Sequence, residues 1–79
     1  MATLLLFGPA RSLAGQPSVT IDASSLTELC DAACRRFGPE FATVLRASAL
    51  WVNGDPVSGD PAIGDRDEVA VVPPVSGGV

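Results

Sequence analysis

Three shortages limit what this chain of 79 residues can do. It has no histidine, which is the side chain that proteins use most often as a general base and a metal ligand. It has no lysine, so copies of the chain cannot be joined to one another through side-chain amides. It is poor in basic residues, and its formal net charge of −4 argues against nucleic acid as a partner, because phosphate binding requires a basic surface.

Long apolar runs are also missing. No run approaches the ~20 residues that a membrane helix needs. The segment Leu4-Leu5-Leu6-Phe7 is too short for a signal peptide and has no basic start. We therefore expect a cytoplasmic protein with no membrane partner. The length predicts one domain, too small for a cleft between domains, which favours a carrier, a binding module or a subunit over a stand-alone enzyme.

What is present begins with apolar runs that predict strands. The continuous run at residues 3–7 (TLLLF) is typical of a strand buried on both faces. The alternating, β-branched segment 18–21 (SVTI) predicts a second strand. Glycines and prolines between them favour a loop over residues 8–17, so the two strands are expected to form a hairpin with a long loop.

One main helix is predicted next. Ser25 and Glu28 have the spacing of a capping box, and apolar residues then recur at helical intervals up to Phe37. Gly38 and Pro39 are typical of a helix end, so the helix is expected over residues 26–37. Apolar residues at 41, 44 and 45 indicate a further short helical turn.

The second half of the chain predicts more strands. Residues 49–52 (ALWV) favour a strand, and Asn53-Gly54 is a strong hairpin signal, with a weak returning strand around Val57. A polar loop over 58–67 leads to the last strand, 68–72 (EVAVV). The continuously apolar strands near both chain ends are expected in the middle of the sheet. Together these elements predict an α+β fold: a mixed sheet of four to five strands with one main helix packed on one face.

Four groups of residues carry a resemblance to a known family. They are listed here in chain order: the first-loop pattern Phe7, Arg11, Leu13 and Gly15; the hairpin Val52-Asn53-Gly54; the turn and strand Gly64-Asp65-Arg66-Asp67-Glu68-Val69; and the tail Pro73-Pro74-Val75-Ser76-Gly77-Gly78. With the order of elements, they resemble the MoaD/ThiS family of ubiquitin-like sulfur carriers, and MoaD most closely. The resemblance implies a β-grasp domain over residues 1–74 and a flexible Gly-Gly tail over residues 75–79.

The resemblance also implies a chemistry. In the family, an E1-like enzyme uses ATP to adenylate the terminal glycine carboxylate, which here corresponds to Gly78, and sulfur then replaces AMP to give a thiocarboxylate. The chain itself would bind no cofactor. Gly77 and Gly78 suit a tail that must enter a partner's active site, because glycine has no side chain. The tail-positioning residues are Pro73, Pro74, Val75 and Ser76, whose prolines hold the base of the tail extended.

The recipient of the sulfur is expected to be the large subunit of a molybdopterin synthase, in molybdenum cofactor biosynthesis. The same chemistry would serve another client, such as cysteine, thiamin or a secondary metabolite. Two further classes stay open: a ubiquitin-like modifier joined to target lysines, and a passive β-grasp module that binds a partner through its sheet.

Val79 departs from the family pattern, in which the chain ready for activation ends at the second glycine. A peptidase that removes Val79 is one explanation. An addition made for expression is a second, and an activating enzyme that tolerates Val79, or no activation at all, is a third.

Partner contacts are expected at Phe7, Arg11 and Val72. For Arg11 an ordinary surface position is an equal alternative, and Phe7 and Val72 are also interpreted as core or sheet residues. Trp51 is interpreted as a half-buried strand residue, with an interface role as the alternative.

Cys30 and Cys34 are interpreted as small apolar residues, with Cys30 in the core, because two cysteines are too few for a metal or iron–sulfur site. The acidic residues of the second half are interpreted as turn formers and solvated charge, with steering toward a basic partner as the alternative: Asp55, Asp60, Asp65, Asp67 and Glu68.

Overall fold

The computed structural model describes residues 1–73, which form a mixed sheet and three helices. The elements in chain order are β1 (Ala2–Leu6), α1 (Gly8–Ala14), β2 (Ser18–Ile21), α2 (Leu26–Phe37), α3 (Pro39–Ala47), β3 (Ala49–Val52), β4 (Asp55–Pro56) and β5 (Glu68–Val72). The predicted α+β class is confirmed.

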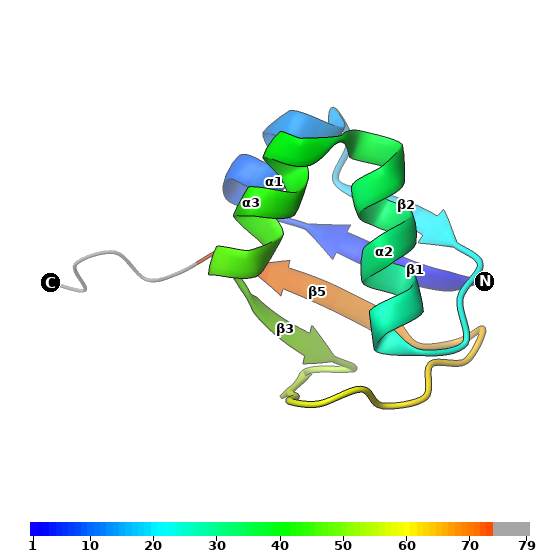
Figure 1. Ribbon diagram of the computed structural model, residues 1–79. Coiled ribbons are helices and arrows are strands. Elements are labelled where there is room, and N and C mark those ends of the chain that lie inside the picture. Colours follow the sequence, from blue (N-terminus) through cyan, green and yellow to red (C-terminus); the bar gives the residue numbers. More distant parts are fainter. Residues whose placement is uncertain (74–79) are drawn as a thin grey trace, which may run out of the picture.

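The sheet has the strand order β2-β1-β5-β3-β4. β1 and β5 pair in parallel at its centre, with Leu4 opposite Val69, and the other pairs are antiparallel. The prediction that the apolar strands near both chain ends lie in the middle of the sheet is confirmed. Because parallel strands end at the same edge of a sheet, the chain leaves β5 beside the point where β1 leads into α1 (Figure 1).

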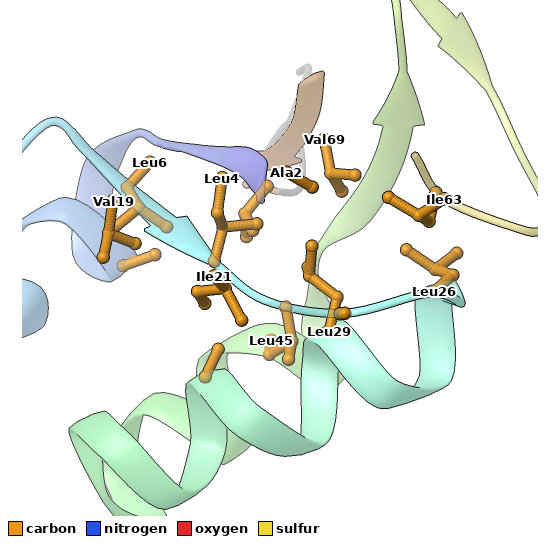
Figure 2. Close-up of a cluster of buried hydrophobic side chains, with 14 of the residues drawn as sticks. Ala2, Leu4, Leu6, Val19, Ile21, Leu26, Leu29, Leu45, Ile63 and Val69 are labelled. Carbon is orange, nitrogen blue, oxygen red and sulfur yellow. The ribbon is translucent and has the colours of Figure 1, made fainter. Parts of the chain in front are cut away.

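The hydrophobic core lies between the sheet and the helices α2 and α3 (Figure 1). The fully buried side chains with the largest volumes are Phe41, Leu4, Leu6, Leu29, Val69 and Val71. Figure 2 shows Leu29 of α2 and Leu45 of α3 beside strand residues such as Leu4 and Ile21. Burying one such side chain contributes about 1.5–3 kcal/mol, so this layer is the main source of stability.

The helices cover one face of the sheet, and this corrects the prediction for residues 3–7. Within β1, Leu4 and Leu6 are buried, whereas Thr3 and Leu5 on the opposite face are only partly buried. The strand also ends at Leu6, one residue earlier than expected. A continuous apolar run does not reveal which of its faces will be covered, so the expectation of two buried faces was wrong.

α2 has the predicted bounds and begins as predicted. The backbone N–H of Glu28 donates to Oγ of Ser25 at 3.1 Å, and Oε1 of Glu28 accepts from the N–H of Ser24 at 3.0 Å. The backbone N–H of Thr27 donates to Oδ1 of Asp60 at 2.7 Å, so a distant loop also caps this end. At the other end, Gly38 has φ 98°, a conformation that favours glycine.

Two local predictions were wrong because proline was interpreted only as a breaker. Residues 8–14 form helix α1 rather than a loop, and Pro39 begins the nine-residue helix α3 rather than a single turn. Proline is compatible with the first turn of a helix, where its missing N–H would have no partner in the helix. The predicted weak returning strand is present as β4 at Asp55–Pro56, antiparallel to β3, and the N–H of the next residue, Val57, donates to the carbonyl of Leu50 at 3.1 Å.

Candidate functional site

The expected tail begins where the central strand β5 ends. Val72 is the last residue of β5 and is partly buried, and Pro73 follows it. β5 is hydrogen-bonded to β1 on one side and to β3 on the other. The base of the tail is therefore attached to the best-supported part of the sheet. Residues 74–79, which include Pro74, Val75, Ser76, Gly77, Gly78 and Val79, lie outside the described residues, so their expected roles stay predictions.

Phe7 lies beside this point, and the structure corrects its expected place in the core or the sheet. It is the residue between β1 and α1, and 46% of its surface is exposed. Its backbone is extended, with φ −134° and ψ 156°. Strand alternation therefore continues through Phe7 and places its side chain on the same face as Leu5, away from the helices. This exposed aromatic residue is available to a partner.

Arg11 is exposed on α1 rather than in a loop. Its carbonyl accepts a hydrogen bond of 2.9 Å from the N–H of Gly15, which has φ 76° and ends the helix. Ala10 and Ala14 face the interior, the first fully buried and the second partly packed against the core. Arg11 thus points to solvent from a short helix whose inner face packs on the core through small apolar residues. This position is compatible with either of its two predicted roles.

The uncovered face of the sheet carries a row of apolar side chains. Leu5 is paired with Ala70, Ala70 with Trp51, and Trp51 with Pro56. The neighbours of Leu5 and Ala70 in their strands are buried under the helices, so these two residues point to the other face. Trp51 is 37% exposed, close to its prediction as a half-buried strand residue.

Val72 and Ala49 pair beside this row and extend it toward Phe7. We call Leu5, Phe7, Ala49, Trp51, Ala70 and Val72 the open apolar face. The sequence analysis identified Phe7 and Val72 but missed Leu5, Ala49 and Ala70. The signal available was strand alternation, which the continuous runs TLLLF and EVAVV conceal.

Two of the motifs that carry the family resemblance are bonded to each other. The N–H of Asn53 donates to the carbonyl of Glu68 at 2.8 Å, and the N–H of Glu68 donates to Oδ1 of Asn53 at 2.9 Å. Nδ2 of Asn53 donates to Oδ1 of Asp67 at 3.0 Å, and Oδ2 of Asp67 accepts from the N–H of Gly64 at 2.7 Å. The backbone N–H of Gly64 is the larger cause, and Asn53 the second, that lowers the pKa of Asp67. We call these residues the Asn53–Asp67 network.

Two of the acidic residues of the second half, Asp67 and Asp60, form hydrogen bonds that stabilise the fold. Asp67 links the β3–β4 hairpin to the start of β5, and Asp60 caps α2. Both carboxylates therefore bond to backbone or side-chain donors at turns and helix ends, which agrees with their interpretation as turn formers. Steering toward a basic partner stays a prediction.

Cys30 and Cys34 are free thiols one turn apart on α2. Cys30 is partly buried and packs against the core rather than lying within it, which corrects its predicted position. Burial, and then the neighbouring Cys34, raises the pKa of Cys30 to about 11. Burial also raises the pKa of Cys34. Both thiols are thus protonated at neutral pH and are poor nucleophiles.

Side-chain chemistry has no obvious place in the described part of the chain. Residues 1–73 form no pocket for a small substrate and no cluster of three or more residues that could hold a metal ion. None of the helices among these residues is long and apolar enough to span a membrane. The features that remain are the open apolar face and the point, beside Phe7, where the C-terminal segment begins.

Comparison with known proteins identifies the family. The model of the ThiS family matches residues 4–78. A molybdopterin synthase sulfur carrier subunit of Arabidopsis thaliana is 35% identical over 78 residues, which are 95% of this chain and 80% of that protein. A protein of the same name from Dictyostelium discoideum is 32% identical over 80 residues, with 95% and 93% of the two chains covered.

Solved structures support the β-grasp fold. The small archaeal modifier protein 1 of Methanosarcina acetivorans superposes with a TM-score of 0.86 at 19% identity, covering 96% of this chain and 94% of that one. A putative molybdopterin converting factor subunit 1 of Pyrococcus furiosus gives 0.81 at 26% identity, covering 94% and 97%. A complex of subunits 1 and 2 of the molybdopterin-converting factor of Helicobacter pylori gives 0.74 at 23% identity, covering 96% of each chain.

Proposed function

The chain belongs to the ThiS family, and we propose from this membership that it is a sulfur carrier of the MoaD/ThiS type which carries sulfur as a thiocarboxylate on Gly78. The names of two relatives, both molybdopterin synthase sulfur carrier subunits, support molybdopterin biosynthesis as the pathway. The protein would then act as the sulfur-carrying subunit of a two-subunit synthase.

The observation that carries this proposal is the attachment of the Gly-Gly segment to β5. The last described residue, Pro73, follows a strand that is paired on both sides, and the sequence continues directly as PVSGG. The domain thus carries, directly after this strand, a segment that contains two consecutive residues without side chains. Such a segment suits delivery of a main-chain carboxylate into a narrow active site, because glycine has no side chain that would widen the chain.

The chemistry places few demands on the side chains of this protein. A carboxylate is a poor acyl donor until an oxygen of Gly78 attacks the α-phosphorus of ATP and pyrophosphate leaves. Hydrosulfide then attacks the carbonyl carbon of the acyl-adenylate, a C–S bond forms as the C–O bond to AMP breaks, and the thiocarboxylate remains. An E1-like enzyme would supply the ATP site and the sulfur, so the carrier needs no catalytic histidine or lysine of its own.

Val79 follows Gly78 in the sequence, and whatever follows Gly78 has to be removed before its carboxylate can be adenylated. We propose that a peptidase performs this step. The isopropyl group of Val79 adds bulk to the end of the segment, and while the amide between Gly78 and Val79 is intact, Gly78 has no carboxylate to attack ATP.

The open apolar face is the proposed docking surface for the E1-like enzyme and for the synthase large subunit. It carries Phe7 and Trp51, two exposed large side chains of the kind that often dominate binding energy. The face includes Val72, the last residue of β5, so a partner that covers it also reaches the start of the C-terminal segment. The structure of a two-subunit complex in Helicobacter pylori supports a partner of this kind.

A matched pair of chains tests the activation step. One ends at Gly78 and the other at Val79, and each is mixed with the E1-like enzyme of its own organism, magnesium and ATP, while pyrophosphate release is measured. We expect release with the chain that ends at Gly78 and none with the chain that keeps Val79. Absence of release from both chains, with an enzyme active on another carrier, would contradict the proposal. A tail found in isopeptide linkage to lysines would instead indicate a modifier.

A further inference from the structure

Asn53 and Gly54 form the turn between β3 and β4, and Asn53 is the only asparagine of the chain. The backbone nitrogen of the residue after an asparagine can attack Cγ of the asparagine side chain, and glycine obstructs this attack least because it has no Cβ. In the reaction a new C–N bond closes a five-membered succinimide, the C–N bond to the side-chain amide breaks, and ammonia leaves with the proton of the attacking nitrogen. Water then opens the ring to aspartate or isoaspartate.

The conformation of Asn53 keeps the two reacting atoms apart. Its φ is 51°, in the left-handed region. This conformation brings Cβ close to the carbonyl oxygen of the same residue. In a planar peptide the carbonyl oxygen and the nitrogen of Gly54 lie on opposite sides of the carbonyl carbon, so the side chain of Asn53 starts on the far side from that nitrogen. Both residues are exposed, so the fold blocks the reaction by conformation and not by excluding water.

The Asn53–Asp67 network holds this conformation in place. Nδ2 of Asn53 donates to Oδ1 of Asp67 at 3.0 Å, and Oδ1 of Asn53 accepts from the N–H of Glu68 at 2.9 Å. The backbone N–H of Asn53 donates to the carbonyl of Glu68 at 2.8 Å. Bringing Cγ to the nitrogen of Gly54 requires rotation about the Cα–C bond of Asn53, which reorients the turn and breaks the strand pairing beside it. The hairpin therefore has to open before Asn53 can react.

We propose that Asn53 is a latent deamidation site: the folded β3–β4 hairpin blocks attack by Gly54, and local opening of the hairpin permits it. The product cannot return to the network. Aspartate carries a carboxylate where Asn53 carries Nδ2, so the hydrogen bond to Asp67 is lost and two like charges face each other. Isoaspartate adds one atom to the backbone and disrupts the pairing of Val52 with Asp55. Modified chains therefore open more readily, and the modification marks chains that have opened. This inference does not depend on the proposed function.

The rate of deamidation in the folded full-length chain tests the block. Because the chain has no lysine, trypsin cuts it after Arg46 and Arg66 and releases residues 47–66, in which mass spectrometry detects the replacement of the side-chain NH₂ by OH. The same peptide, incubated free in the same mildly alkaline buffer, gives the unprotected rate. We expect the folded chain to react at least about 10-fold more slowly, since only its open form reacts. Equal rates in the folded chain and the free peptide would overturn the proposal.

Two matched variants distinguish opening of the hairpin from unfolding of the whole domain. Asp67→Ala removes the acceptor of Nδ2 of Asn53, and the rate in the folded chain should rise about 2- to 10-fold, as for the loss of one hydrogen bond. Ile21→Val removes one buried methylene from β2, at the opposite edge of the sheet, and should leave the rate unchanged. Equal acceleration by both variants would overturn the hairpin as the protecting element. If Asp67→Ala does not fold, Asp67→Asn, which can accept only one of the two hydrogen bonds, replaces it.

A further pair of variants tests why the product destabilises the hairpin. Asn53→Asp reproduces one product, and we expect it to lower the midpoint of urea unfolding. Adding Asp67→Asn should raise the midpoint again, because the new amide can donate to the carboxylate at residue 53 while its oxygen accepts from the N–H of Gly64. A double variant that is less stable than Asn53→Asp alone would overturn the assigned role of Asp67.

Discussion

The two ends of β5 are held in different ways. At its start, Glu68 exchanges hydrogen bonds of 2.8 and 2.9 Å with Asn53, and Asp67 joins the same network. At its end, the strand leads into Pro73, which has no N–H to donate. Directional hydrogen bonds fix the register of the strand at one end. At the other end, Val72 is paired with Ala49, and the chain then leaves the sheet toward the Gly-Gly segment.

This difference indicates that the motifs that carry the family resemblance have separate roles. Val52-Asn53-Gly54 and the GDRDEV segment are structural, because their polar groups bond to each other. The PPVSGG segment makes no predicted contribution to the core, and its proposed task is chemical. Variants at the two ends should therefore have different effects. Variants in the C-terminal segment should lower activity without lowering stability, whereas variants at the start of β5 should lower stability without lowering activity.

The largest expected effect is at the chemical end. Deletion of Gly78 together with Val79 should abolish thiocarboxylate formation. The chain would then end at Gly77, one residue short of the length needed for its carboxylate to reach the α-phosphorus of ATP. Deletion of Val79 alone is the matched control and should allow thiocarboxylate formation, which the chain that keeps Val79 should not show. Mass spectrometry after incubation with the activating enzyme measures both. The midpoint of thermal unfolding should be the same for the two chains, and a large difference would show that the tail also stabilises the domain.

A substitution at the structural end should have the opposite profile. Asn53→Ala removes two side-chain hydrogen bonds and places alanine at φ 51°, so we expect the free energy of unfolding to fall by about 1–3 kcal/mol. Asn53→Gly keeps the turn conformation and loses only the hydrogen bonds, so its effect should be smaller. Urea unfolding measures both. At temperatures where the variants stay folded, adenylation should be unchanged, and a loss of adenylation without a loss of stability would contradict the division.

The smallest expected effect is a pH dependence. Hydrogen bonds from Gly64 and Asn53 hold the pKa of Asp67 below its usual value near 3.8. A carboxyl group whose pKa is lower in the folded protein contributes stability above its unfolded pKa and loses it as the pH falls through the folded pKa. Stability should therefore decline as the pH falls below the usual pKa of an aspartate and through the lower pKa of folded Asp67, and Asp67→Asn should flatten this decline. Parallel curves of unfolding free energy against pH for the two proteins would contradict the assignment.

Much of the fold follows from local sequence signals. The bounds of α2 were predicted correctly because Ser25, Glu28 and Gly38 act through neighbouring backbone groups. The central position of β1 and β5 followed from their continuous apolar composition. α1 was missed because Pro9 looks the same at the start of a helix and in a loop. What distinguishes the two is the burial of Ala10, which only the folded structure reveals.

The candidate site was predicted less completely. The exposed position of Phe7 depends on the turn at Gly8, and the open apolar face depends on which side of the sheet the helices cover. The local periodicity of apolar residues predicts neither of these two features. The position of Phe7 near the end of β5 joins opposite ends of the chain, so it could not be predicted without the parallel pairing of β1 and β5. The roles of residues 74–79 stay predictions.

The intact mass of the untagged protein, purified from its own host, tests the central claim most directly. The account predicts a chain that ends at Gly78, with a fraction in which one oxygen is exchanged for sulfur and which reverts on hydrolysis. A chain that keeps Val79 and carries no sulfur, purified from cells that are actively making molybdenum cofactor, would contradict activation through Gly78.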